Sequence, residues 1–154
     1  MVTFNLLFPI LSVSLSLLIA AVVACIAYWQ HSLAKERFKL DMFEKRFAVY
    51  KATQRFLSVI FRDGKVDLEK LSEFRRDTQD ATFLFGQAIP AYLKRLDVQA
   101  LNLVAINDRL RGLQVGEERS RLCREKTGLL HALIGELPNL KNVFASYLKF
   151  DKWK

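Results

Sequence analysis

The chain has 154 residues, of which 51% are hydrophobic and 26% are charged, and its formal net charge is +8. This apolar share is too high for a disordered tail, and the length allows one domain with its own core beside a further segment. Cys25 lies in an apolar run and Cys123 in a charged region, so we expect no disulfide framework and a reducing compartment.

The first element in chain order is an apolar run without charge. No Asp, Glu, Lys or Arg occurs from Val2 to Ala34, and residues 10–29 are almost wholly apolar. About 20 apolar residues are enough for a helix to cross a bilayer. We therefore predict a transmembrane anchor over residues 1–31 and a helical domain over residues 32–154.

Two cleaved forms of this segment are the alternatives to an anchor. A signal peptide ordinarily carries Lys or Arg in its first residues and an apolar core of about 7–15 residues. Here the first basic residue is Lys35 and the apolar core is longer. A lipoprotein signal is the closer alternative, because the residues from Val22 to Cys25 loosely resemble a lipobox. The residues that follow Cys25 stay apolar, however, so we expect the segment to remain uncleaved.

Basic residues follow the span and none precedes it. Lys35, Arg37 and Lys39 form a basic flank, which the positive-inside rule places in the cytoplasm, with the N-terminus outside. Beside a membrane segment the nearest anions are lipid headgroups, so we expect this flank to face lipid. The lipid membrane is therefore the expected partner, and nucleic acid is not.

Small residues recur every four positions within the span, at Ser12, Ser16, Ala20 and Ala24. On a helix they share one face, and small residues let two helices approach closely in lipid. This face predicts a homo-oligomer. The alternative is that Ser and Ala are simply common in membrane spans.

After the span, the sequence shows helical periodicity and no pattern of alternating strand residues. Since the connections between the expected helices are short, we predict an all-α fold, in which the transmembrane helix continues into a cytoplasmic antiparallel bundle of four to five helices. The expected helices are a continuation of the span to Asp63, Leu68 to about Phe85 with Asp67 as N-cap, Pro90 to about Arg111, Glu117 to about Leu137, and a last helix after Pro138 capped by Asn139. Gly64 should end the first of these helices, and Leu68 should lie on the buried face of the second.

The first helix should bury one apolar seam, and the run at its start mixes aromatic and charged residues. The seam is expected at Leu40, Phe43, Phe47, Tyr50, Leu57 and Phe61. Within the run, the residues predicted to contact either the returning helices or a partner are Asp41, Phe43, Glu44, Arg46, Phe47 and Tyr50. The sequence leaves both kinds of contact open.

This run also resembles a known pattern. The residues 39–53, KLDMFEKRFAVYKAT, are similar to a stretch of the form KLDLFEKRFxVYxAT, which follows the membrane helix in a family of small, functionally uncharacterised bacterial single-pass membrane proteins. The resemblance continues at residues 62–65 (RDGK), 81–86 (ATFLFG) and 144–150 (FASYLKF). It implies a bacterial inner (plasma) membrane and a helical cytoplasmic domain, and it implies no catalytic residues.

No pattern in the sequence points to catalysis, a cofactor or a metal. Cys123 and His131 are eight positions apart on an expected helix, roughly 12 Å along its axis, too far for a thiolate–imidazole pair. We expect Cys123 to be a small core residue. The first hypothesis is therefore a non-enzymatic membrane-anchored interaction or scaffolding protein with a protein partner. The alternatives are a membrane-active effector that oligomerises through its span, and an enzyme whose site the sequence does not reveal.

Overall fold

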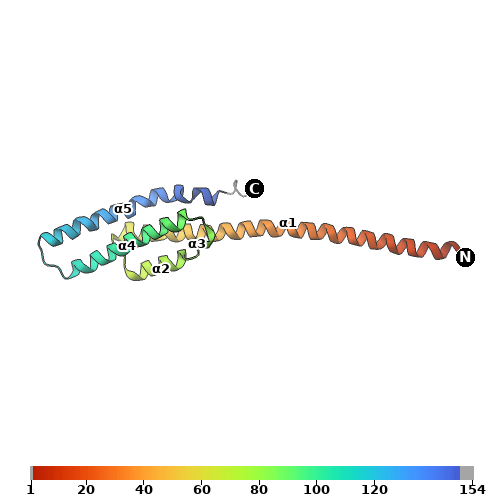
Figure 1. Ribbon diagram of the computed structural model, residues 1–154, viewed down its shortest axis with the longest axis horizontal. Helices are drawn as coiled ribbons and strands as arrows, with labels where there is room; N and C mark the ends of the chain where they lie inside the picture. Colours follow the sequence, from red (N-terminus) through yellow and green to blue (C-terminus); the bar gives the residue numbers. More distant parts are fainter. Residues whose placement is uncertain (1, 150–154) are drawn as a thin grey trace. The chain divides into compact units, whose positions relative to one another are not determined.

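The computed structural model describes the backbone of residues 2–149 and the side chains of residues 18–149. Over this range the chain is helical and contains no strand, so the all-α class is confirmed. The helices, shown in Figure 1, are α1 (Val2–Asp63), α2 (Leu68–Thr78), α3 (Ala81–Leu84), α4 (Ala88–Arg111) and α5 (Glu117–Leu148).

The internal contacts divide the chain into two units, Met1–Asp41 and Met42–Lys154. The described residues of the first unit belong to α1, and all of their side chains are exposed. The part of α1 whose side chains are described, Leu18–Asp63, is long and apolar enough to cross a membrane, as judged by its length and composition. A domain boundary after residue 31 stays a prediction.

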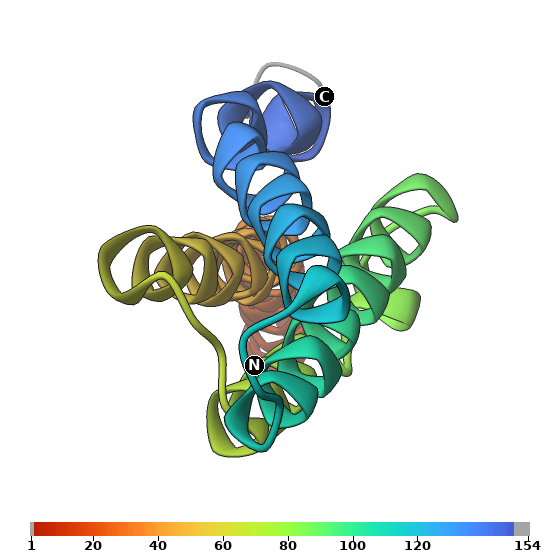
Figure 2. The same cartoon turned by 90° about the vertical axis from the view of Figure 1, so that its left-hand side faces the viewer.

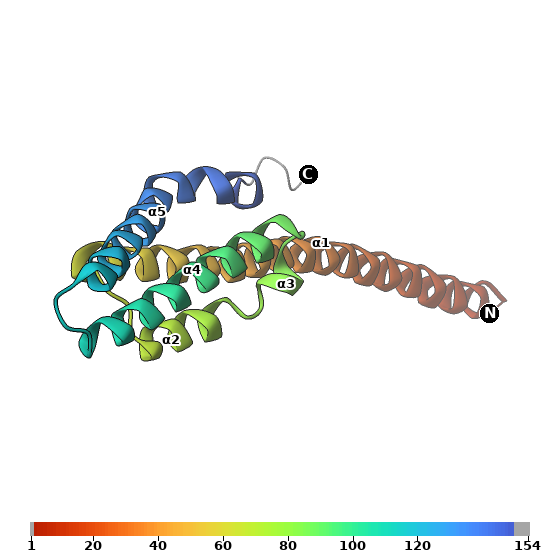
Figure 3. The same cartoon turned by 60° about the vertical axis from the view of Figure 1, so that its left-hand side comes forward.

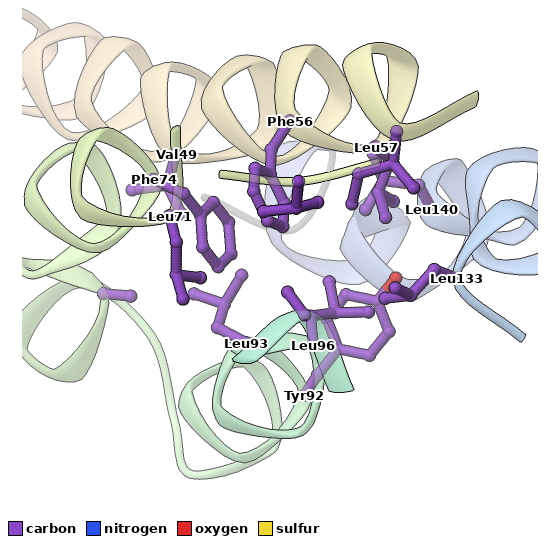
Figure 4. Close-up of a cluster of buried hydrophobic side chains, with 14 of the residues drawn as sticks. Val49, Phe56, Leu57, Leu71, Phe74, Tyr92, Leu93, Leu96, Leu133 and Leu140 are labelled. Carbon is purple, nitrogen blue, oxygen red and sulfur yellow. The ribbon is translucent and has the colours of Figure 1, made fainter. Parts of the chain in front are cut away.

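The second unit, which we call the helical unit, has one apolar core built from all of its longer helices. Figure 4 shows this core, in which Phe56 of α1 stacks on Phe74 of α2 and Leu57 of α1 lies beside Leu140 of α5, with Leu93 and Leu96 of α4 below them. Figures 2 and 3 show α4 running beside both α2 and α5. The side chains with at most 1% of their surface exposed include Leu57, Ile60, Leu71, Ile89, Leu96, Leu103, Leu133, Leu140 and Phe144.

The turn between α1 and α2 forms as its residues predict. Gly64 has a φ of +60°, which favours glycine, and its amide donates to the carbonyl of Ile60 at 2.9 Å. Asp67 is the N-cap of α2, because its Oδ1 accepts a hydrogen bond from the amide of Lys70 at 2.8 Å. Both expectations are confirmed. Leu68, expected in the core, is instead 58% exposed.

The helix expected from Leu68 to about Phe85 is broken in two. It ends at Thr78, and α3 begins at Ala81. Thr78 and Asp80 have low helix propensity, and the Thr78 hydroxyl donates to the carbonyl of Phe74 at 2.7 Å. Ala81 and Phe85 remain buried, so the break changes the direction of the chain without removing these side chains from the core.

Pro138 does not end a helix, contrary to the sequence prediction. The helix α5 passes through it, and no separate helix begins at Asn139. A proline inside a helix costs about 3 kcal/mol, whereas burying a Leu or Phe side chain contributes roughly 1.5–3 kcal/mol. Leu133, Leu140 and Phe144, on both sides of the proline, are all fully buried, and together they outweigh that cost. Figure 3 shows the bend in α5 that a proline causes.

The buried face of α1 differs from the predicted seam. Of the predicted residues, Leu57 is buried and Phe43 and Tyr50 are half-buried, as expected. Leu40, Phe47 and Phe61 are exposed, while Val49 and Ile60 are buried. The true face is displaced by about one residue from the prediction, because the helix packs between α2 on one side and α5 on the other. Its buried residues are Val49, Ala52, Thr53, Phe56, Leu57 and Ile60.

Candidate functional site

Four of the residues predicted to make contacts lie together on the part of α1 that belongs to the helical unit. The rings of Phe43 and Phe47 stack with their centroids 5.7 Å apart, and Phe47 stacks on Tyr50 at the same distance. The Tyr50 ring then meets the ring of Phe144 of α5 edge-on at 5.6 Å. A row of aromatic side chains thus leads from the surface of α1 into the core.

Phe144 is the centre of this arrangement. Besides Tyr50, its ring meets the edge of Phe85 at 5.6 Å and of Tyr92 at 6.5 Å. Phe85 also contacts Tyr147 at 5.3 Å. Edge-to-face aromatic pairs at these distances are favourable beyond the area that they bury. We call these rings, Phe43, Phe47, Tyr50, Phe85, Phe144 and Tyr147, the aromatic cluster.

Arg46 joins α1 to the short helix α3. Its Nε donates a hydrogen bond to the backbone carbonyl of Leu84 at 2.8 Å, and its guanidinium lies 5.7 Å from the ring centroid of Phe85. A hydrogen bond from a charged donor to a part-buried carbonyl is stronger than one from a neutral donor. Arg46 therefore fixes the end of α3 against α1.

Unlike Arg46, the two acidic residues of the predicted set lie at the surface. Asp41 and Glu44 are exposed, and neither makes an ion pair within residues 18–149. The structure thus brings together Phe43, Arg46 and the two following aromatic residues of the predicted set, and leaves both carboxylates at the surface. Contact of any of these residues with a partner stays a prediction.

The predicted membrane features lie in the first unit. Lys35, Arg37 and Lys39 of the basic flank are exposed, as are Ala20 and Ala24 of the small-residue face. The side chains of Ser12 and Ser16 lie outside the described residues.

The sequence did not indicate a polar cluster between α4 and α5. Arg95 Nη2 lies 2.7 Å from Glu136 Oε1, and the Arg95 guanidinium lies 5.3 Å from the ring centroid of Tyr92. Burial, and then the negative charge of Glu136, raise the pKa of the Tyr92 hydroxyl. Among residues 18–149, no hydrogen-bond partner is found for the buried atoms Tyr92 Oη and Glu136 Oε2. The one feature of the sequence that could have indicated this cluster is the position of Glu136 within an apolar stretch of α5.

Within the described residues, the two side chains considered for a thiolate–imidazole pair, Cys123 and His131, lie at the surface. Within them, no group of three or more His, Cys, Asp or Glu side chains could hold a metal ion. His131 is exposed, and so is Cys123, which corrects the expectation that this cysteine lies in the core. The features that the structure shows in this part of the chain are an apolar helix, the aromatic cluster and polar surfaces.

Comparison with known proteins finds no matching family model, no matching curated protein and no matching solved structure.

Proposed function

We propose that the chain is a non-enzymatic, single-pass membrane protein, which holds a helical interaction or scaffolding domain at the membrane surface. The observation that carries this proposal is the exposed apolar surface of the first unit. Every large apolar side chain described there is at least 47% exposed, whereas soluble proteins rarely leave such a continuous apolar surface uncovered. Lipid is the cover that its length and composition fit.

The flanks of the apolar segment support an orientation with the helical unit in the cytoplasm of a bacterial cell. Trp29 and Tyr28, both 73% exposed, are the residue types that concentrate at the membrane–water interface. The basic flank of Lys35, Arg37 and Lys39 follows within about three helical turns of Trp29 and can bind anionic headgroups. On this reading the helical unit is an antiparallel bundle held close to the inner membrane.

The native cysteines provide the test of this topology. In spheroplasts of a Cys25→Ser variant, a membrane-impermeant maleimide should leave Cys123 unlabelled until the cells are permeabilised, since Cys123 is exposed on the helical unit. A Thr3→Cys substitution in a chain that lacks both native cysteines should be labelled in intact spheroplasts. Labelling of Cys123 from outside would overturn the orientation, and release of the chain by carbonate would overturn the anchor.

A homo-oligomer through the small-residue face is the second part of the proposal. Single cysteines at Ser12 and Ser16 should crosslink between chains more strongly than a cysteine at Leu17, which lies off that face. Equal crosslinking at the three positions would show that the chains do not pair through the small-residue face. Expression with a membrane-potential dye tests the alternative function, because depolarisation would favour a membrane-active effector over an interaction protein.

A further inference from the structure

A cleft of about 910 Å³ lies in the helical unit where the turn between α1 and α2 approaches the end of α4 and the start of α5. Its volume is at the upper end of the roughly 300–1,000 Å³ range of ligand sites. Four cationic side chains line it: Lys65, Arg111, Arg119 and Lys126. Apolar side chains, including Val66, Leu68 and Val104, form the wall between them.

The cations of the cleft exceed the negative charge available to them. The two carboxylates of the cleft are already engaged, Asp67 as the N-cap of α2 and Asp108 in an ion pair of 3.4 Å with Arg111. Lys65 and Lys126 make no ion pair within 4 Å among residues 18–149. The cleft can therefore accept further negative charge.

One of the cations is held in place by the backbone. Arg119 Nη1 donates to the carbonyls of Leu110 at 3.3 Å and Leu113 at 2.7 Å, at the end of α4. These carbonyls are neutral, so the positive charge of Arg119 remains uncompensated. The cleft thus has one fixed cation and two adaptable lysines.

The exposure of the lining residues favours a macromolecular occupant over a small molecule. Small-ligand sites bury most of the ligand and use a few buried, convergent polar groups. Here the side chain of Arg111 is 82% exposed, and Leu68 is an exposed apolar residue beside the cations. Val115, in the loop between α4 and α5, is 95% exposed. Apolar residues surrounded by charge are typical of a protein interface.

We propose that this cleft binds an acidic amphipathic segment of a partner protein. Carboxylates of the segment pair with Lys65 and Lys126, and its apolar side chains pack on the exposed side chain of Leu68. A phosphate backbone fits less well, because it carries no apolar groups to cover the exposed Leu68 beside the cations. This inference rests on the proposed function, since it supplies the partner surface of the anchored domain.

The test uses the full chain in detergent micelles, with a fluorescent amphipathic peptide of Glu and Leu at helical spacing as the probe. We expect saturable binding that weakens with added salt, because ion pairs across a protein interface are screened. Bound peptide should also protect Cys123, which lines the cleft, from maleimide in a Cys25→Ser background. Absence of saturable binding, or of protection, overturns the proposal.

Charge-reversed variants locate the site. Lys65→Glu combined with Lys126→Glu should lower the affinity for the peptide by about ten-fold. Lys45→Glu combined with Lys141→Glu is the matched control, because it makes the same change in net charge at two exposed lysines that do not line the cleft, and the affinity of this variant should be unchanged. Circular dichroism verifies that each variant is folded. Equal losses in the cleft and control variants overturn the assignment.

Competition experiments separate this occupant from others, and carbonate extraction separates the two proposals. If inorganic phosphate or a single-stranded oligonucleotide displaces the peptide as well as unlabelled peptide does, the cleft is a general anion site and the proposal is wrong. If the chain resists carbonate extraction but binds no peptide, only this inference fails. If the peptide binds but carbonate releases the chain, only the membrane anchor fails.

Discussion

The side chain of Phe144 offers the sharpest test of how the helical unit is held together. It is fully buried in α5 and contacts the rings of Tyr50, Phe85 and Tyr92, which come from α1, the segment before α4 and α4 itself. Replacing it with alanine removes a side chain on which these elements converge.

The expected cost follows from the size of the deleted group. A buried Phe→Ala substitution destabilises a protein by about 3–5 kcal/mol. The unit Met42–Lys154 should have a free energy of unfolding of roughly 6–17 kcal/mol, at 0.05–0.15 kcal/mol per residue. Phe144→Ala should therefore leave the unit folded at room temperature but lower its melting temperature by roughly 10–20 °C.

The assay is thermal unfolding of the full chain in a mild detergent, followed by circular dichroism. Phe83→Ala is the matched control, because Phe83 is 86% exposed on α3, and it should change the free energy of unfolding by less than about 0.5 kcal/mol. Equal effects of the two substitutions would refute the reasoning, since burial would then not distinguish the two phenylalanines.

Three further substitutions test local features of the same unit. Asp67→Ala should cost about 1 kcal/mol in urea unfolding, because the amide of Lys70 loses its cap; an unchanged midpoint would contradict the cap. Arg46→Met should cost about 1–3 kcal/mol by leaving a part-buried α3 carbonyl unpaired, whereas Lys45→Met, at an exposed position, should be neutral. Because the pKa of Tyr92 is raised on folding, its stabilising effect is complete below about pH 10 and is lost as the pH rises further. Tyr92→Phe should therefore flatten the alkaline fall in stability, and an unchanged pH profile would show that this hydroxyl is not responsible.

The features that the sequence predicted well are those that depend on a few neighbouring residues. Gly64 supplies a left-handed residue and ends α1, and Asp67 three positions later caps α2. Pro90 lies in the first turn of α4, where a missing amide costs nothing. Each of these effects acts within about one helical turn, so no knowledge of the packing was needed.

The features that the sequence did not predict depend on contacts between distant segments. Pro138 ends a helix only if the residues beyond it have nothing to bury, and here Leu140 and Phe144 are buried. The face of α1 could have been read one residue earlier or later, since Phe56 and Leu57 are both apolar. Phe56 stacks on Phe74 of α2, and this contact sets the rotation of α1 so that Phe56 and Leu57 are both buried. The pairing of Arg95 with Glu136 joins residues far apart in sequence.

The run of residues 39–53 shows how packing and partner contacts can be separated. Arg46 and Tyr50 contact α3 and α5, so these positions are constrained by the fold of the helical unit alone. Asp41 and Glu44 are exposed and make no ion pair in the described part of the chain. Of this run, therefore, only such exposed positions could be altered to test a partner without disturbing the core. Substituting both carboxylates should leave the melting temperature unchanged. A weaker interaction with a partner protein in the same variant would then report a lost contact and not a lost fold.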